Sequence, residues 1–264
     1  MNKSSLIMAA VVLVATLAAA GCRPALQGDR DTLYQVSSIS ALMQGVYDGS
    51  VTVADLRKYG DFGLGTFDAL DGEMVELDGK FYQVKLDGTV VGVPDSLKTP
   101  FAAVTFFDND KSYALDRPVD LSGLQTYIDS LLPSLNLFYA VKVDGAFSYM
   151  KTRSVPPQSL PYLPLADAVK GQQVSEFRDV EGTMIGFRCP PYVDGVNVPG
   201  YHFHFLDKER KRGGHVLDCS ASDVSINIDN TASMIMALPE TVGFYRVDLG
   251  KAAAEALKQV EQGK

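Results

Sequence analysis

The sequence predicts an α+β protein, built mostly from antiparallel and mixed β-sheets with flanking helices. Six Asp-Gly dipeptides separate short runs of alternating apolar and polar residues, the pattern of strands joined by tight turns. Residues 121–132 instead carry apolar side chains at the spacing of an amphipathic helix. Around position 200, histidine alternates with aromatic residues, which predicts a strand with two different faces.

Length and composition allow one large domain or two smaller ones, and prolines point to two. The chain has 264 residues, of which 46% are hydrophobic, enough for one large core or two smaller ones. Prolines 156, 157, 161 and 164 interrupt the pattern and indicate the boundary. We therefore expect an N-terminal α+β sheet domain over residues 34–157 and a C-terminal β-rich metal-binding domain with a helical tail over residues 158–264.

The first 21 residues have the features of a signal peptide of the lipoprotein type. Lys3 precedes an apolar run over residues 6–20, which is shorter than the roughly 20 residues that a membrane-spanning helix needs. Small residues then lead to Cys22, the expected site of lipid attachment. We expect export from a bacterial cytoplasm, a tether over residues 22–33 and a lipid anchor at the cell envelope, with secretion of an unlipidated protein as the alternative.

The first domain begins with a strand at residues 34–38 that enters a helix capped near Ser38. Thr52 and Asp55 resemble a capping box that opens a second, short helix ending at Gly60. The glycine-rich segment 63–65 lacks the Gly-Lys-Ser/Thr continuation of a phosphate loop, so it is interpreted as a close approach of backbone leading into a sheet.

The next strand, residues 73–77, carries the first candidate catalytic residue. Period-two alternation places Glu73 on the same face as Val75 and Leu77. A carboxylate on an apolar face is costly unless something compensates it, so Glu73 is either a functional group or the exposed end of a strand.

Residues 101–107 read as a central strand, and residues 137–143 and 146–155 as a hairpin about Asp144-Gly145. Arg153 lies near the end of this hairpin, on the face of Phe147 and Tyr149. From the pattern alone, a lone arginine in that position is more often a solvated residue at a sheet edge.

The second half predicts a small barrel or sandwich. Strands are expected at residues 174–180, 183–188, 224–228 and 233–238. The helical tail at 251–262 places two carboxylates, Glu255 and Glu261, where they could reach back to the sheet, although such residues are usually solvated.

All the histidines of the chain lie in one hairpin. His202 and His204 project from one face of a strand, and a charged turn ending in two glycines leads to His215 on the returning strand. Three imidazoles with an open fourth position are typical of a catalytic zinc site. The alternative is three unrelated histidines, and spacing alone does not separate an enzyme from a metal-binding, cupin-like barrel. The formal net charge of −8 argues against a nucleic-acid partner.

Cys189 and Cys219 remain if Cys22 is lipidated. In an exported protein they could form a disulfide, or they could be buried free thiols.

Three segments together resemble the alpha-acetolactate decarboxylase family. They are YQVSSISALMQGVYDGSVTVADLRKYGDFGLGTF, TPFAAVTFF and GTMIGFRCPPYVDGVNVPGYHFHFLDKERKRGGHVLD, and the resemblance covers nearly all of the chain beyond the signal peptide. It implies a two-domain α+β homodimer that converts the small molecule 2-acetolactate to (R)-acetoin and carbon dioxide. It also implies a zinc ion held by His202, His204 and His215, with Glu73 and Arg153 completing the site. A glutamate of the tail reaches the metal in that family, and it corresponds to Glu261 or, failing that, Glu255.

The implied chemistry suits these residue types. Decarboxylation leaves electrons that must be held as an enediolate, and Zn²⁺ can accept that charge as a Lewis acid without an organic cofactor. Our hypothesis is that Arg153 pairs with the anionic substrate and that Glu73 handles the proton delivered to carbon. The competing interpretations are a cupin-like metal hydrolase or dioxygenase and a non-catalytic zinc-binding lipoprotein.

Overall fold

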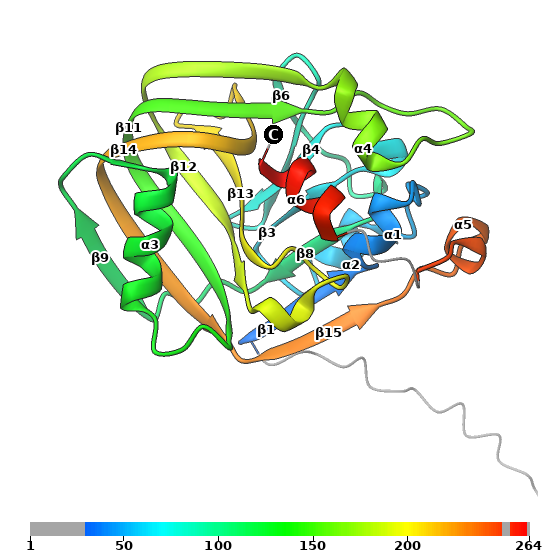
Figure 1. Cartoon of the computed structure of the whole chain (residues 1–264), viewed down its shortest axis with the longest axis horizontal. Coiled ribbons are helices and arrows are strands. Elements are labelled where there is room, and N and C mark those ends of the chain that lie inside the picture. The colour runs from blue at the N-terminus through cyan, green and yellow to red at the C-terminus, as the bar shows by residue number, and fades with distance from the viewer. Residues whose placement is uncertain (1–29, 250–253, 263–264) are drawn as a thin grey trace, which may run out of the picture.

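Two β-sheets packed face to face make up most of the protein in a computed structural model that describes residues 30–249 and 254–262 (Figure 1). The predicted signal peptide, Cys22 and most of the tether lie outside these residues. No helix in the described ranges is both long and apolar enough to cross a membrane.

The first sheet has seven strands in the described part of the chain, in the order β15-β1-β8-β3-β4-β5-β6. Neighbouring strands are antiparallel except β1 and β15, which run parallel, so the sheet is mixed. Its strands are β1 (Thr32–Val36), β3 (Phe62–Thr66), β4 (Glu73–Leu77), β5 (Lys80–Val84), β6 (Val90–Gly92), β8 (Ala102–Thr105) and β15 (Ser233–Ala237).

The second sheet is antiparallel and contains the longest strands. Its order is β10-β14-β11-β12-β13, with β9 pairing with β14 and a further pairing between β13 and β14. The strands are β9 (Lys111–Leu115), β10 (Val119–Asp120), β11 (Phe138–Ser154), β12 (Gln173–Cys189), β13 (Gly200–Asp207) and β14 (Gly213–Thr231). A separate two-stranded ribbon joins β2 (Val51–Thr52) to β7 (Lys98–Thr99).

Short helices cover the sheets. They are α1 (Ile39–Met43), α2 (Val53–Leu56), α3 (Leu121–Leu131), α4 (Leu165–Ala168), α5 (Val242–Arg246) and α6 (Ala254–Gln262). Two predicted caps are present, since Ser38 Oγ accepts from the Ala41 amide (3.2 Å) and Thr52 Oγ1 accepts from the Asp55 amide (3.2 Å). These side chains satisfy amides that have no partner within the helix.

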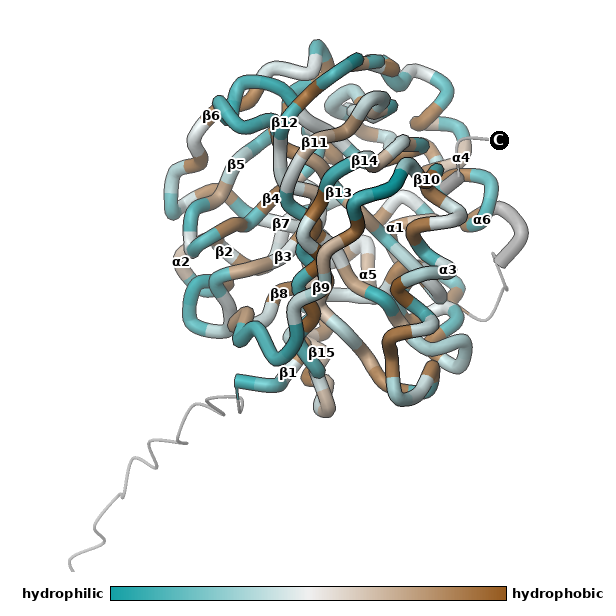
Figure 2. Tube along the Cα trace, turned by 90° about the vertical axis from the view of Figure 1, so that its left-hand side faces the viewer, coloured by the Kyte–Doolittle hydropathy of each residue, from teal (hydrophilic) through white to brown (hydrophobic). Residues whose placement is uncertain are grey.

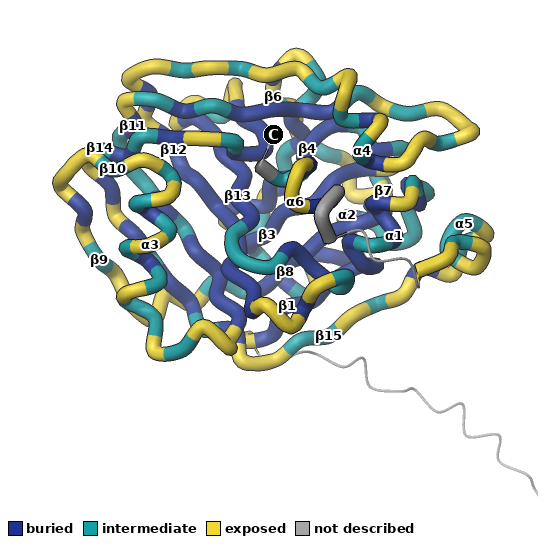
Figure 3. Tube along the Cα trace, viewed as in Figure 1, coloured by how far each residue is buried: buried dark blue, intermediate teal, exposed yellow. Residues whose placement is uncertain are grey.

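The core lies between the sheets and on both of their outer faces. Between them, Leu64 and Val75 of the first sheet share a buried cluster with Ile185, Phe187 and others of the second. Apolar and polar residues are interspersed along the chain trace (Figure 2), while the buried residues follow the strands and the exposed ones gather at turns and on α5 (Figure 3). The alternation read from the sequence therefore corresponds to the two faces of each strand.

The predicted α+β class with antiparallel and mixed sheets is confirmed. Two boundaries predicted from the sequence need correction here. Residues Thr32 and Leu33, assigned to the tether, already belong to β1 and are buried. The predicted strands at 174–180 and 183–188 are one continuous strand, β12.

The predicted hairpin about Asp144-Gly145 is wrong, because β11 runs unbroken from Phe138 to Ser154. Gly145 sits in the middle of this strand with φ of +145°, paired with β12 on one side and β14 on the other. A Cβ atom there would collide with the carbonyl oxygen of Asp223. The glycine thus permits a close approach of neighbouring strands rather than a turn.

The predicted division at residue 157 does not coincide with the division between the sheets. β11 comes from the first half of the chain and is the central strand of the second sheet, while β15 comes from the second half and completes the first sheet. Each sheet therefore contains strands from both halves.

Candidate metal centre

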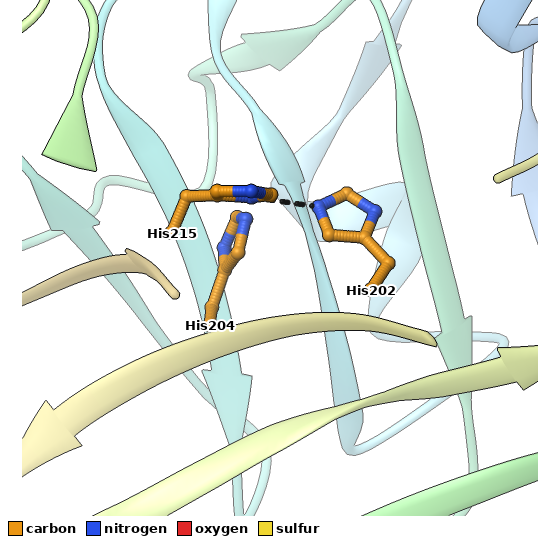
Figure 4. A group of neighbouring side chains, drawn as sticks. All are labelled: His202, His204 and His215. Carbon is orange, nitrogen blue, oxygen red and sulfur yellow. Dashed lines mark hydrogen bonds between the residues drawn. The ribbon is translucent and has the colours of Figure 1, made fainter. Parts of the chain in front are cut away.

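β13 and β14 bring the three histidines together. His202 and His204 project from the same face of β13, because they are two residues apart, while Phe203 and Phe205 pack into the core on the other face. The register of the β13 and β14 pairing places His215 directly opposite His204. All three imidazoles are buried, and Figure 4 shows their rings converging on one point.

The two glycines before His215 allow this convergence. β14 starts between β13 and β11, and a Cβ atom on Gly213 would collide with the carbonyl oxygen of Phe205. A Cβ atom on Gly214 would come within 2.5 Å of the carbonyl oxygen of Arg153. Residues with side chains would push β14 away from both neighbours, and His215 with it.

Hydrogen bonds to backbone carbonyls fix which ring nitrogen faces the centre. A carbonyl only accepts, so His204 Nδ1 donates to Met74 O (2.7 Å) and His215 Nε2 donates to Glu261 O (3.0 Å). His204 therefore presents the lone pair of Nε2, and His215 that of Nδ1. The His202 Nε2 atom lies 3.2 Å from His215 Nδ1, the dashed line of Figure 4.

Glu73, Arg153 and Glu261 come from three other elements and surround the histidines. The first residue of β4, Glu73, places its Oε2 atom 3.5 Å from His204 Nε2. Near the end of β11, Arg153 is paired in register with His215. The α6 residue Glu261 places Oε2 3.6 Å from His202 Nε2.

Arg153 is buried, not solvated at an edge as its sequence pattern suggested. The pairing of β11 with β14 shifts register between Lys151 and Thr152, and such an irregularity changes the direction in which a side chain points. Its Nη1 atom donates to Gln172 Oε1 (3.3 Å), whereas Nε is buried with no hydrogen-bond partner. A donor is therefore available for a ligand.

Burial keeps the histidines neutral. It lowers the pKa of His202 to about 3, with Arg153 as the second cause, and it lowers the pKa of His204 and His215 well below the ordinary value. Neutral imidazole is the form that binds a metal ion.

The two carboxyl groups respond to burial in the opposite direction. Burial raises the pKa of Glu73 to about 7 and that of Glu261 to about 7, while the Arg153 guanidinium acts to lower both. In the absence of a cation, each carboxyl group therefore exchanges its proton near neutrality.

The donor set fits a metal ion. One nitrogen from each of the three histidines lies within 4.8 Å of the others, and His204 Nε2 and Glu261 Oε2 are buried without hydrogen-bond partners. Buried polar atoms are rarely left unpaired, so these indicate an ion that is to be bound. The 3.2 Å between His202 and His215 matches the spacing of about 3.3 Å expected for two nitrogens on one tetrahedral zinc.

A small cavity adjoins the histidines, with a volume of about 30 Å³. Its polar side is formed by the six residues above together with Thr66, and its other wall is apolar. That wall, which the sequence patterns did not identify as part of a site, consists of Ile39, Leu42, Gly65, Leu70, Phe101, Val155 and Leu165. These positions carry no distinguishing spacing, because each reads as an ordinary core residue.

The remaining predictions about single residues have mixed outcomes. Cys189 and Cys219 are buried free thiols and do not form a disulfide. Of the two tail carboxylates, Glu261 reaches the histidines, while the side chain of Glu255 lies outside the described residues.

A buried three-histidine centre flanked by two carboxyl groups and an arginine, with an apolar cavity beside it, is typical of a metal-dependent enzyme. Comparison with known proteins then gives the family. Residues 33–251 match the family described as alpha-acetolactate decarboxylase. The chain belongs to this family, whose members are decarboxylases.

Individual relatives agree with this assignment. The chain is 53% identical over 232 residues to the alpha-acetolactate decarboxylase of Methanosarcina mazei, an alignment covering 88% of this chain and 81% of the relative. It is 42% identical over 217 residues to that of Bacillus subtilis, covering 82% of this chain and 85% of the relative. The crystal structure of alpha-acetolactate decarboxylase from B. subtilis strain 168 superposes with a TM-score of 0.86 at 40% identity, covering 88% of this chain and all of the other.

Proposed function

We propose that the protein decarboxylates 2-acetolactate to (R)-acetoin and carbon dioxide with the help of a zinc ion held by His202, His204, His215 and Glu261. The convergence of three neutral, buried imidazoles is the observation that carries this proposal. Relatives that bear the name of this activity support it over most of the chain. When bound, zinc would supply Lewis-acid stabilisation of the negative charge left on substrate oxygen as carbon dioxide departs.

Arg153 would bind and orient the anionic substrate. Its unpaired Nε–H group is buried beside the histidines, where a charge-assisted hydrogen bond to an oxygen anion is strong. As the bond to the carboxylate carbon breaks, its electron pair moves into an enediolate. The guanidinium stabilises that charge in a region from which most water is excluded.

Glu73 would deliver the proton that ends the reaction. Its carboxyl group is buried, with Oε2 3.5 Å from His204 Nε2, and burial acts to raise its pKa, which favours the protonated form that a donor needs. Protonation at carbon from one fixed side yields one enantiomer of acetoin. The position of Glu73 at the start of β4, across the cavity from α6, gives the donor a defined direction.

The test is acetoin formation from racemic 2-acetolactate by the protein beginning at Arg23, before and after chelation and again after zinc is restored. Activity should disappear on chelation and return with zinc. A folded, zinc-loaded protein that makes no acetoin would contradict the proposal. Manganese and iron, added in place of zinc, would show which metal ion supports the activity.

The histidine hairpin is tested separately by His204→Ala. This change removes a ligand and its hydrogen bond to Met74, so zinc binding should weaken by at least about a hundredfold. Metal analysis after dialysis measures the loss, and circular dichroism verifies the fold. Unchanged zinc content would mean that the metal binds elsewhere.

We also propose that the protein is exported, carries a lipid on Cys22 and works as a homodimer at the cell envelope. The apolar run before Cys22 and the family resemblance support these proposals. Sedimentation of the protein beginning at Arg23 would measure the oligomeric state, and a monomer at micromolar concentration would contradict the dimer.

A further inference from the structure

The cavity beside the histidines is too small for the proposed substrate. Its volume is about 30 Å³, whereas a protein cavity known to hold benzene, which has fewer non-hydrogen atoms than 2-acetolactate, measures about 150 Å³. Some part of the wall must therefore move before the substrate can reach Arg153 and Glu73. This step rests on the proposed function, which names the substrate.

A second, larger cavity lies next to the first. It measures about 400 Å³ and is lined by Pro191, Asp194, Val198, Pro199, Tyr201, Leu257, Lys258 and Glu261. Among these residues, Glu261 also lines the small cavity. The Glu261 residue of α6 therefore stands between the larger cavity and the metal centre.

α6 can move at less cost than the strands of the wall. The histidines, Glu73 and Arg153 lie on strands, and displacing a strand would break several ladder hydrogen bonds at once. The described contacts of α6 are instead apolar packing and a hydrogen bond at its end. Leu257 and Val260 are buried among apolar residues of α1, α4 and Val198, and Glu261 O accepts one hydrogen bond from His215. In Figures 1 and 3 the helix lies at the surface beside α4, with one exposed side.

Among the charged residues that line the larger cavity, Lys258 can attract an anion, while Asp194 and Glu261 are acidic. Lys258 is exposed on α6 and is the basic residue among the described residues that line this cavity. It is three positions before Glu261, so it lies one helical turn away on a neighbouring part of the same surface. An incoming carboxylate would meet Lys258 before it meets Arg153.

We propose that the cavity lined by Lys258, Asp194 and Tyr201 is the entrance to the metal centre, and that α6 moves Glu261 aside to let the anionic substrate pass. With Glu261 displaced, the two cavities join into one space large enough for the substrate. When the helix returns, Glu261 O again accepts from His215 and closes the site. The same movement admits the substrate and releases acetoin.

A reversible plug in the entrance tests this. Lys258→Cys is treated with a bulky methanethiosulfonate reagent, which forms a mixed disulfide in the larger cavity. Cys189 and Cys219 do not compete, because both are buried and burial raises the pKa of each thiol to about 12. Lys111→Cys carries the same group on the exposed strand β9 and is the matched control.

Two rates are measured on the zinc-loaded protein, kcat/KM for 2-acetolactate and the rate at which a chelator removes zinc. Relative to the untreated Lys258→Cys protein, modification should lower both at least about tenfold, and phosphine reduction should restore both. The modified Lys111→Cys protein should show no change. Zinc removal is independent of catalysis, so this rate still tests the entrance if the protein makes no acetoin.

Unchanged rates in the modified protein would overturn the proposal. A fall in kcat/KM with an unchanged rate of zinc loss would also overturn it, because a plug in the entrance must slow both the substrate and the chelator. If circular dichroism shows that modified Lys258→Cys is unfolded, Asp194→Cys places the same group at another residue that lines the entrance. The same expectations and the same contradicting results then apply to that variant.

Discussion

Strand β4 carries two buried glutamates that face opposite ways, and their surroundings differ. The side chain of Glu73 faces the histidines and Arg153. On the other face of the strand, Glu76 is wholly buried, and neither of its carboxylate oxygens has a hydrogen-bond partner. Comparing substitutions at the two positions therefore separates the effect on kcat of losing a reactive carboxyl group from the effect of losing a buried one.

Glu73→Gln should abolish turnover while zinc remains bound. The amide keeps the size of the side chain but cannot donate a proton as an acid, so kcat should fall by about a hundredfold or more. Acetoin production and zinc content, measured on the same sample, test this. Glu76→Gln is the control for the loss of a buried carboxyl group on this strand, and its kcat should be unaffected. Full activity of Glu73→Gln would remove this residue from the mechanism.

Glu76→Gln should instead change how stability depends on pH. Burial, and secondarily Asp61, raises the pKa of Glu76 well above its usual value. The folded protein therefore holds a proton that the unfolded chain releases above about pH 4.5. As pH rises from there towards the folded pKa, wild-type protein loses up to about 1.4 kcal/mol of unfolding free energy per pH unit through this group.

The glutamine variant lacks that loss. The difference in unfolding free energy, variant minus wild type, should therefore be larger at pH 8 than at pH 5. Urea unfolding of both proteins at the two pH values measures it. An equal difference at both values would show that Glu76 is not held protonated.

At the residue scale, the sequence identified site residues where their spacing shows which face of a strand they occupy. The alternation at His202 and His204 and the position of Glu73 on an apolar face were readable, because both follow from period-two geometry. The direction of Arg153 was not, since it depends on an irregularity in the pairing of β11 with β14. The position of Glu261 beside the histidines was implied by the family resemblance and not by spacing, because a residue 46 positions from His215 is brought there by the tertiary structure.

At the scale of elements, β11 shows how the environment overrides a local signal. Asp-Gly is a strong turn signal, yet residues 144 and 145 lie within a strand that is hydrogen-bonded on both sides. Partners distant in the chain supply those bonds, so a window of sequence cannot reveal them. The features that were read correctly, such as α3 and the capped starts of α1 and α2, are determined by contacts within a few residues, whereas α2 ends at Leu56 and not at the predicted Gly60.

Gly145→Ala should destabilise the protein by about 1–3 kcal/mol. The added methyl group would meet the Asp223 carbonyl, and the positive φ is unfavourable for alanine. The matched control is Gly92→Ala on the edge strand β6, where a Cβ atom would meet nothing within 4 Å, and its effect should stay within about 0.5 kcal/mol. Urea unfolding measures both. Equal stability of the two variants would show that the close approach of β14 does not require glycine at position 145.

At the scale of the whole molecule, the sequence predicted the fold class but not the way the chain divides between the sheets. Prolines near residue 157 are a real interruption, but β15 joins the first sheet, and β9, β10 and β11 share the second sheet with β12, β13 and β14. Strand propensity does not specify a partner. The pairing of β1 with β15, separated by about two hundred positions, is set by packing in the finished structure.

The proposed export and lipid attachment also concern the whole molecule. Mass spectrometry of protein isolated from cell envelopes should find a mature chain that begins at Cys22 and carries acyl groups. Replacing Cys22 by serine should shift the protein from the membrane fraction to the soluble one. An unmodified Cys22, or a mature chain that begins elsewhere, would contradict the anchor.

The parallel pairing of β1 with β15 also has a consequence for biosynthesis. Thr32 lies opposite Ser233, so β1, which leaves the ribosome before the other described strands, waits for β15, the last of them, before its outer edge is covered. Until then, β1 exposes unpaired backbone that could pair with other chains. Premature termination anywhere before residue 233 leaves this edge open and also removes Glu261. A truncated product would therefore lack the proposed ligand and carry an open sheet edge, the kind of surface that leads to aggregation or to removal by chaperones and proteases.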